Sequence, residues 1–236
     1  NKMMYSFSHS KDTASLLVKA YNGRTTKLCY RPDQNGRLVT NRGNSAINLH
    51  IKPEIRPREG DVKPFIDFME YMFPIPSERK EMMKWCATLI AHPEVHMEYG
   101  VLLVSEHQGI GKSTLGIILS KLVGDSNVSF PSENDVTGSD FNGWLANKRL
   151  AVVNEIYSGH SWKAYNRLKG VITDPTVDVN QKFQRTYTVE NWIHIFACSN
   201  SLRALKIEDD DRRWFYPEVT ERSWPREKFK TLYNWI

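Results

Sequence analysis

The stretch Val104-Ser-Glu-His-Gln-Gly-Ile-Gly-Lys-Ser-Thr114 decides the fold of this chain, because it places two glycines, a lysine and two hydroxyls between two apolar segments. The run 100–105 before it is typical of a buried parallel strand. The segment after it has apolar residues at helical spacing, which predicts a helix that Gly124 closes. These apolar residues are Leu115, Ile118, Leu119 and Leu122. A strand, a glycine turn and a helix in this order are typical of a phosphate-binding loop.

The residues of this loop are suited to binding ATP with Mg²⁺. Backbone N–H groups can surround the phosphates, Lys112 can neutralise the β and γ groups, and the Ser113 hydroxyl can ligate Mg²⁺. The nucleotide-binding residues expected are Gln108, Gly109, Ile110, Gly111, Lys112, Ser113 and Thr114. Glu106 stands where the strict pattern has its first glycine. A dinucleotide-binding loop is excluded because Thr114 occupies the position where such a loop has its third small residue, Gly or Ala. Lys112 would also have no role in a dinucleotide-binding loop.

Length and composition allow one large core, or an ATPase domain with a smaller appendage. The chain has 236 residues, 40% of them hydrophobic, and its net charge of +5 is compatible with a nucleic-acid partner. Its three cysteines are widely separated, which predicts a reducing cytoplasm. No apolar run approaches the roughly 18 residues that span a bilayer, so no membrane partner is expected. The first residue is Asn1, which predicts a piece of a longer protein.

Two histidines four residues apart, His92 and His96, raise the question of a metal site. The sequence argues against one, because a zinc protease motif has Glu directly after the first His. Here Pro93 follows His92 and would distort the helix that has to present both ligands.

The order of expected elements predicts three parts. Residues 1–60 form a β-containing appendage and linker, with strands expected over 27–30 and 46–52. Residues 61–97 form a helical lead-in, whose second helix begins near the N-cap candidate Ser77 and buries Met82, Trp85, Cys86 and Leu89. Residues 98–236 alternate strands with helices, which predicts an α/β core with a mostly parallel sheet covered by helices.

Polar residues follow two of the later strands. The strand 150–155 ends in Asn154 and Glu155, where a general base and a Mg²⁺ ligand are expected. We assign Glu155 as the base and as a metal-site residue, and Asn154 as a second metal-site residue whose amide adds no charge. The apolar strand 192–200 ends in Asn200, whose amide can bond the γ-phosphate or the attacking water. The alternative for Asn200 is that it only begins a turn.

The segment Asp209-Asp-Asp-Arg-Arg213 places two arginines shortly after that strand. Arginine stabilises charge in phosphoryl transfer, sometimes from a neighbouring subunit, so Arg212 and Arg213 are catalytic candidates. A surface ion-pair cluster is the alternative.

A hairpin with a basic, aromatic tip is expected between these strands. Apolar and polar residues alternate on both sides of the tip at 180–185. An exposed Phe183 between Lys182 and Arg185 would suit a single-stranded backbone, with charges on phosphates and the ring against bases. In the alternative, Phe183 folds back onto the domain.

Taken in order, these motifs resemble those of superfamily 3 helicases, most closely the helicase part of phage and plasmid primase-helicases and primase-polymerases. The resemblance covers roughly residues 60–220 and includes the segment Phe141-Asn-Gly-Trp-Leu145. It implies an AAA+-like P-loop ATPase that forms a ring of about six subunits, with ATP and Mg²⁺ between neighbours. It also implies translocation along single-stranded DNA during replication, together with other replication domains or proteins.

In this resemblance Lys112, Ser113, Glu155 and Asn200 serve ATP hydrolysis, and Lys182 with Phe183 contacts DNA. Two other classes stay open. One is an ATP-gated DNA-binding or scaffold module with weak or no hydrolysis, which would suit the missing acid at Asn154. The other is a small-molecule P-loop kinase, in which a lid with arginines would replace the basic hairpin.

Overall fold

The computed structural model describes residues 27–41, 43–156, 161–201 and 211–236. The chain divides into two compact units, Asn1–Leu49 and His50–Ile236. In the larger unit, the segment before the first helix is attached to the domain by Asn127, whose Nδ2 donates a hydrogen bond to the Ile51 carbonyl at 2.6 Å.

The described part of the smaller unit is a three-stranded sheet in the order β1-β3-β2, with β1 parallel and β2 antiparallel to β3. The strands are β1 (Lys27–Cys29), β2 (Leu38–Asn41) and β3 (Asn44–Asn48). Its small core consists of Cys29, Val39 and Ala46. The sequence predicted strands near β1 and β3 but did not predict β2.

A five-stranded parallel sheet, in the order β10-β4-β9-β6-β5, forms the centre of the larger unit. Its strands are β4 (Gly100–Val104), β5 (Val128–Ser129), β6 (Leu150–Val153), β9 (His194–Ser199) and β10 (Trp214–Phe215). The three central strands β4, β6 and β9 are buried along their whole length, as expected for a parallel sheet covered on both faces. The predicted α/β fold with a parallel sheet is therefore confirmed.

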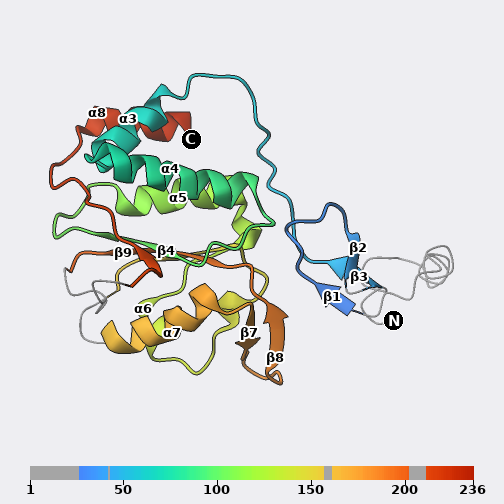
Figure 1. Ribbon diagram of the computed structural model, residues 1–236. Helices are drawn as coiled ribbons and strands as arrows, with labels where there is room; N and C mark the ends of the chain where they lie inside the picture. Colours follow the sequence, from blue (N-terminus) through green and yellow to red (C-terminus); the bar gives the residue numbers. More distant parts are fainter. Residues whose placement is uncertain (1–26, 42, 157–160, 202–210) are drawn as a thin grey trace. The chain divides into compact units, whose positions relative to one another are not determined.

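Helices cover both faces of this sheet (Figure 1). One face carries α3 (Lys63–Met72), α4 (Pro76–Ala91), α5 (Lys112–Val123) and α8 (Arg226–Trp235). The other carries α6 (Glu133–Thr137), α7 (Ser161–Thr173) and the hairpin of β7 (Thr176–Val179) and β8 (Tyr187–Glu190). Two short 3-10 turns, η1 (Asp125–Asn127) and η2 (Gly143–Leu145), complete the described elements.

Alternate residues of each strand point to opposite faces, so the sheet separates two cores. The core under α3, α4 and α5 takes Val101, Leu103, Val152, Phe196 and Cys198 from the strands. The core under α7 takes Leu102, Val104, Ala151, Val153, Ile195 and Ala197. The predicted apolar stripe of α4 lies entirely in the first core.

The ends of two helices can be compared with the terminal residues that the sequence predicted. Helix α5 begins after Gly111 and ends at Gly124, as predicted. The prediction of Ser77 as the N-cap of α4 was wrong, because the cap residue is Ile75 and Pro76 is the first helical residue. Proline suits that position since its missing N–H is one that the first turn leaves unpaired anyway.

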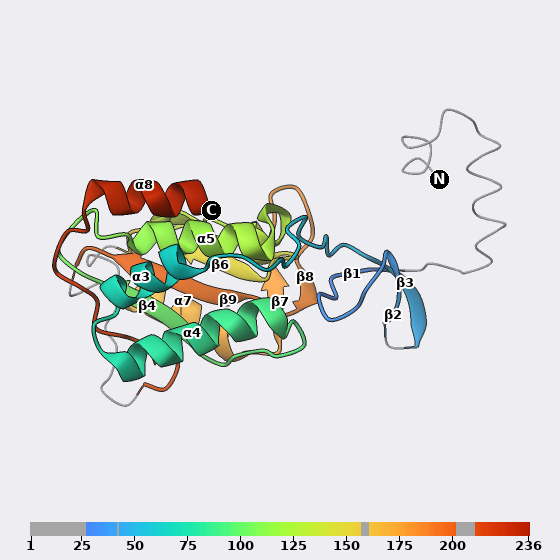
Figure 2. The same ribbon diagram turned by 90° about the horizontal axis from the view of Figure 1, so that it is seen from above.

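The C-terminal helix α8 runs beside α3 (Figures 1 and 2). Its Tyr233 contacts the first turn of α5. Aromatic stacking fixes α8 to α3, with ring centroids 6.0 Å apart for Phe65 and Trp235. Trp224, just before α8, stacks on Tyr71 of α3 with centroids 5.0 Å apart. Within the ranges that the structure describes, no helix is long and apolar enough to cross a lipid bilayer.

Candidate active site

The loop between β4 and α5 has the backbone that its glycines predict. Gly109 and Gly111 have φ angles of 73° and 106°, which side chains rarely tolerate. A Cβ on Gly111 would also lie 2.9 Å from the Phe68 ring. Glu106, the departure from the strict motif, is exposed and does not have a positive φ, so the loop does not require glycine there.

Lys112, the first residue of α5, is held beneath the loop. Its Nζ donates hydrogen bonds to the carbonyls of Ser105 at 3.0 Å and His107 at 3.2 Å, and the residue is only 7% exposed. Burial lowers the pKa of Lys112, while the carboxylates of Glu221 and Glu155 act in the opposite direction. The loop therefore carries a fixed ammonium group at the start of a helix, where an anion is favoured.

Glu155 and Asn200 lie at the carboxyl ends of neighbouring strands. Strands β6 and β9 pair in parallel, and just after β6 the Ile156 N–H donates to the carbonyl of Cys198 in β9 at 3.2 Å. Glu155 has a φ of 60°, a left-handed conformation that is uncommon outside glycine and often found at functional sites. The strand pairing and the turn at Glu155 thus place both side chains at the edge that carries the glycine loop.

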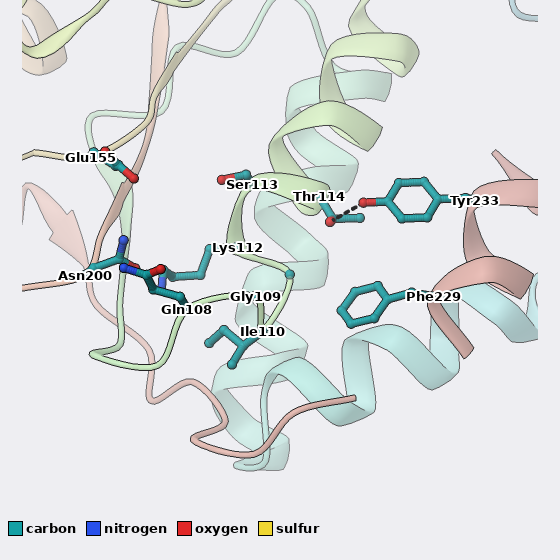
Figure 3. Close-up of a pocket in the computed structure, with 11 residues that line it drawn as sticks. Gln108, Gly109, Ile110, Lys112, Ser113, Thr114, Glu155, Asn200, Phe229 and Tyr233 are labelled. Carbon is teal, nitrogen blue, oxygen red and sulfur yellow. Dashed lines mark hydrogen bonds between the residues drawn. The ribbon is translucent and has the colours of Figure 1, made fainter. Parts of the chain in front are cut away.

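One cavity of about 390 Å³ joins these elements (Figure 3). It is lined by Gln108, Gly109, Ile110, Gly111, Lys112, Ser113, Thr114, Glu155, Asn200, Phe229 and Tyr233. All seven predicted loop residues therefore meet Glu155 and Asn200, which are more than 40 residues away in the sequence. Asn200 follows β9 and also lines this cavity.

Asn154 lies beside this cavity rather than in it. It lines an adjoining pocket of about 490 Å³, which shares Gln108, Glu155 and Asn200 with the first. Of the three predicted metal-site residues, Ser113 and Glu155 line the first cavity together and Asn154 lines the second. Glu133 at the start of α6 also lines the second pocket.

Three residues near the loop escaped the sequence analysis. Glu221, between β10 and α8, accepts a hydrogen bond from Ser105 Oγ at 3.2 Å and pairs with the His107 ring. Phe229 and Tyr233 of α8 line the cavity itself. The only sequence signal for these two rings is their spacing of four residues, which any amphipathic helix can show.

Arg212 and Arg213 do not line either pocket. The Gly100 N–H, at the start of β4, donates to the Arg213 carbonyl at 2.9 Å. The loop follows the other end of this five-residue strand, about 15 Å away at roughly 3.3 Å per residue. Arg213 Nη1 instead binds Asp211 at 2.9 Å, whereas Arg212 is exposed. The structure thus separates both arginines from the cavity of their own chain.

The predicted hairpin is present, and its tip is exposed. Strands β7 and β8 pair antiparallel, and Phe183 is 94% exposed, so it does not fold back onto the domain. Lys182 Nζ lies 5.1 Å from the Phe183 ring centroid, and Arg185 is exposed on the same tip. These three residues form one basic and aromatic surface, which we call the hairpin tip.

The hairpin is braced by the segment before β6. The Asn142 side chain donates from Nδ2 to the Asp178 carbonyl at 2.8 Å and accepts from the Asn180 N–H at 2.6 Å. A Cβ on Gly143 would lie 3.0 Å from the Gln181 side chain, so this side chain packs closely against the backbone of Gly143. These contacts hold the base of the exposed tip in place.

The structure gives no support to a histidine metal site. His92 Nδ1 lies 3.1 Å from Glu94, and burial lowers the pKa of His96. Among the described residues, no group of three His, Cys, Asp or Glu side chains could hold a metal ion.

Comparison with known proteins gives one sequence relative. Over 135 residues the chain is 29% identical to the DNA primase-polymerase of Nitratiruptor phage NrS-1. This part of the chain is homologous to part of that protein. The match covers 54% of the chain but only 19% of the relative. Residues 103–213 also match DUF5906, a family described as being of unknown function.

Solved structures show the same fold in the C-terminal region of NrS-1. An apo structure of that region matches 89% of the chain with a TM-score of 0.75 and 22% identity. A second, the A-form apo structure, matches 95% with a TM-score of 0.75 and 21% identity. The chain covers 52% and 58% of these two structures, about half of each.

Proposed function

We propose that this chain is the ATP-driven motor of a phage or plasmid replication protein, and that it translocates along and unwinds DNA. The observation that carries the proposal is the cavity in which the glycine loop, Glu155 and Asn200 meet at the carboxyl edge of a parallel sheet. Ligands of open α/β sheets bind at this edge. The homology to a phage primase-polymerase supports a role in DNA replication.

The lining residues fit a nucleoside triphosphate with Mg²⁺. Gly109 has a positive φ and no atom within 4 Å of the position of a Cβ, so its backbone faces open space. Ser113 is exposed at the first turn of α5, and its hydroxyl would hold Mg²⁺ together with the Glu155 carboxylate. Bound Mg²⁺ supplies charge neutralisation at the β and γ phosphates.

Each side chain then has a role in hydrolysis. Lys112 would exchange its two carbonyl partners in the loop for phosphate oxygens. Glu155 would accept a proton from the attacking water as general base. Asn200, on the neighbouring strand, would orient that water or bond the γ-phosphate. Asn154 would hold a water in the adjoining pocket without adding charge.

In this proposal the two arginines act only when subunits assemble. Arg212 and Arg213 lie at the amino edge of the sheet, opposite the cavity of their own chain. In a ring, the amino edge of one subunit would face the carboxyl edge of the next, and an arginine would then complete the neighbour's site. This supports a homo-oligomer, in which six subunits would be the expected number.

The hairpin tip provides the DNA contact. Lys182 and Arg185 would bind phosphates of a single strand, and Phe183 would stack on a base or sugar. An exposed Phe at 94% has no folding role in the domain, which favours a motor or DNA-binding module over a P-loop kinase. The scaffold alternative keeps one supporting observation, the uncharged Asn154 beside Glu155.

The rate of ATP hydrolysis with and without single-stranded DNA tests the proposal. A motor hydrolyses ATP, and single-stranded DNA increases its rate. A small-molecule kinase would be indifferent to DNA, and a scaffold would bind DNA without turnover. Absence of hydrolysis under both conditions, with ATP bound, would overturn the motor in favour of the scaffold.

Asn154 allows a sharper distinction between motor and scaffold. Because an aspartate restores the second negative charge beside Glu155, Asn154→Asp is expected to hydrolyse ATP at least as fast as the wild type. Steady-state phosphate release checks this expectation. Loss of turnover in the variant would mean that the amide itself is required.

A further inference from the structure

The cavity has a second half of different chemistry. Phe229 and Tyr233 of α8 line it together with the glycine loop. They lie on the opposite side of the loop from Glu155 and Asn200 (Figure 3). Because both rings lie away from Glu155 and Asn200, the proposed hydrolysis leaves them without a role.

This aromatic half is fixed to the loop and to the core. The Tyr233 hydroxyl and Thr114 Oγ1 share a hydrogen bond of 2.9 Å. The rings of Phe229 and Tyr233 are stacked at an interplanar angle of 27°, with centroids 6.4 Å apart. Phe229 also packs edge-on against the buried Trp224, at 5.2 Å and 89°. Both rings are therefore held in place by the protein itself.

The direction of a bound triphosphate points its base toward these rings. Hydrolysis needs the γ-phosphate near Glu155 and Asn200, and Lys112 reaches the β and γ groups. The α-phosphate, the sugar and the base then extend the other way, past Thr114. Thr114 is the residue that Tyr233 contacts, so the base end of the nucleotide reaches α8.

The geometry points to Phe229 and Tyr233 as the platform on which the base of the bound nucleotide stacks. This inference rests on the proposed function, because it takes the glycine loop as the phosphate site. Stacking brings an aromatic side chain against the flat face of a base, and every base has such a face. The platform therefore supplies affinity for adenine and guanine alike. Half-buried Phe229 and exposed Tyr233 leave such a surface open to a planar ligand.

The experiment compares a ligand that has a base with one that lacks it. Calorimetric titrations with Mg·ATP, Mg·GTP and Mg·tripolyphosphate are run on the wild type, Phe229→Ala and Tyr233→Phe. Phe229→Ala should weaken ATP and GTP binding similarly, by about 5- to 150-fold, the range of one stacking contact. Its affinity for tripolyphosphate should stay within about twofold. Tyr233→Phe keeps the ring but loses the hydrogen bond to Thr114, so its loss of base-dependent affinity should be smaller than that of Phe229→Ala.

Two further variants separate stacking from folding. Trp235 lies on the same helix, stacks on Phe65 and does not line the cavity, so Trp235→Ala should leave the preference for ATP over tripolyphosphate unchanged. Phe229→Trp should retain or strengthen ATP binding, because it keeps a ring in place.

The possible failures are distinguishable. Equal loss of ATP and tripolyphosphate in Phe229→Ala would mean that α8 only supports the loop, which overturns the platform but leaves the proposed function. A loss for ATP with none for GTP would indicate recognition of the base edge in place of stacking. If the wild type binds neither ATP nor tripolyphosphate, the proposed function itself fails and the platform with it.

Discussion

The two edges of the five-stranded sheet differ in the surroundings of their polar and charged side chains. At the carboxyl edge, Lys112 at the start of α5, Glu155 after β6 and Asn200 after β9 line a single cavity. At the amino edge, charged groups are paired locally, as Arg213 is with Asp211 and Arg149 is with the carbonyls of Leu89 and Trp192. The polar side chains of the carboxyl edge therefore face a cavity, whereas Arg213 and Arg149 at the amino edge face partners in their own fold.

The largest effect is expected where the two edges would meet between subunits. Replacing the acting arginine, Arg212→Ala or Arg213→Ala, should cost on the order of 10³-fold or more in ATP turnover, as for arginine fingers generally. Mixing that variant with inactive Lys112→Ala should restore activity, because some interfaces then combine an intact cavity with an intact arginine. The measurement is the ATPase rate of co-assembled mixtures.

A matched mixture serves as the control. Lys112→Ala combined with Glu155→Gln leaves every cavity defective, so no activity should return. If the arginine mixture also shows no recovery despite proven co-assembly, the amino-edge arginines are structural or act within their own chain.

Within the carboxyl edge, the binding and chemical steps should separate. Lys112→Ala should abolish nucleotide binding, because the lysine contacts ground-state phosphates. Glu155→Gln should bind ATP normally and lose about 10²- to 10⁴-fold in turnover, the range for a general base. Equilibrium titration and single-turnover hydrolysis measure the two steps. Equal loss of affinity in both variants would contradict the assigned roles.

The hairpin tip should matter to DNA but not to the nucleotide. Phe183→Ala should cost about 1–3 kcal/mol of DNA binding if a base stacks on the ring. Lys182→Ala should reduce the salt dependence of binding by roughly one phosphate contact. Basal ATP hydrolysis should survive in both.

Gln184 supplies the control for the tip, because it is exposed there and is neither charged nor aromatic. Gln184→Ala should bind single-stranded DNA like the wild type in a fluorescence anisotropy titration. Equal losses in all three variants would indicate a general disturbance of the hairpin and not a stacking contact.

The smallest effect concerns the stability of the amino edge. Burial lowers the pKa of His194 to about 3, with Arg149 acting in the same direction. Below pH 6.5 the His194 ring therefore binds a proton in the unfolded chain but not in the folded chain, so stability falls as pH drops. The free energy of unfolding should decrease by about 1.4 kcal/mol per pH unit from this group.

Urea unfolding between pH 7.5 and 5 tests this slope. His194→Gln removes the titrating ring, and its pH dependence should be correspondingly weaker. His96, whose pKa burial also lowers, leaves a residual slope in the same direction. An unchanged slope in the variant would show that other groups control acid stability.

The sequence was sufficient for those parts of the site that depend on local pattern. The turn at Gly109 and Gly111 was predicted from the order of strand, glycines, lysine and helix, and Glu155 and Asn200 from their places after two apolar strands. The hairpin tip followed from alternation around a polar turn. The departure at Glu106 is explained only by the structure, in which that residue does not need a positive φ.

What the sequence could not give depends on packing between distant segments. Phe229 and Tyr233 reach the cavity because Trp235 of α8 and Trp224 just before the helix both stack on rings of α3. The position of Arg213 is decided by β10, a strand of only two residues that pairs with the start of β4. Patterns this short carry no periodicity, so their partners appear only in the folded chain.

Strand displacement on a forked DNA duplex tests the central claim most directly, because it requires both the cavity and the hairpin tip. The account predicts that the wild type separates the strands with ATP, and that Glu155→Gln binds ATP and DNA without separating them. The double variant Lys182→Ala and Phe183→Ala should hydrolyse ATP without displacing a strand. Strand displacement by this double variant at the wild-type rate would contradict the account. The account would also be contradicted if DNA stimulated ATP hydrolysis by the wild type but the wild type displaced no strand.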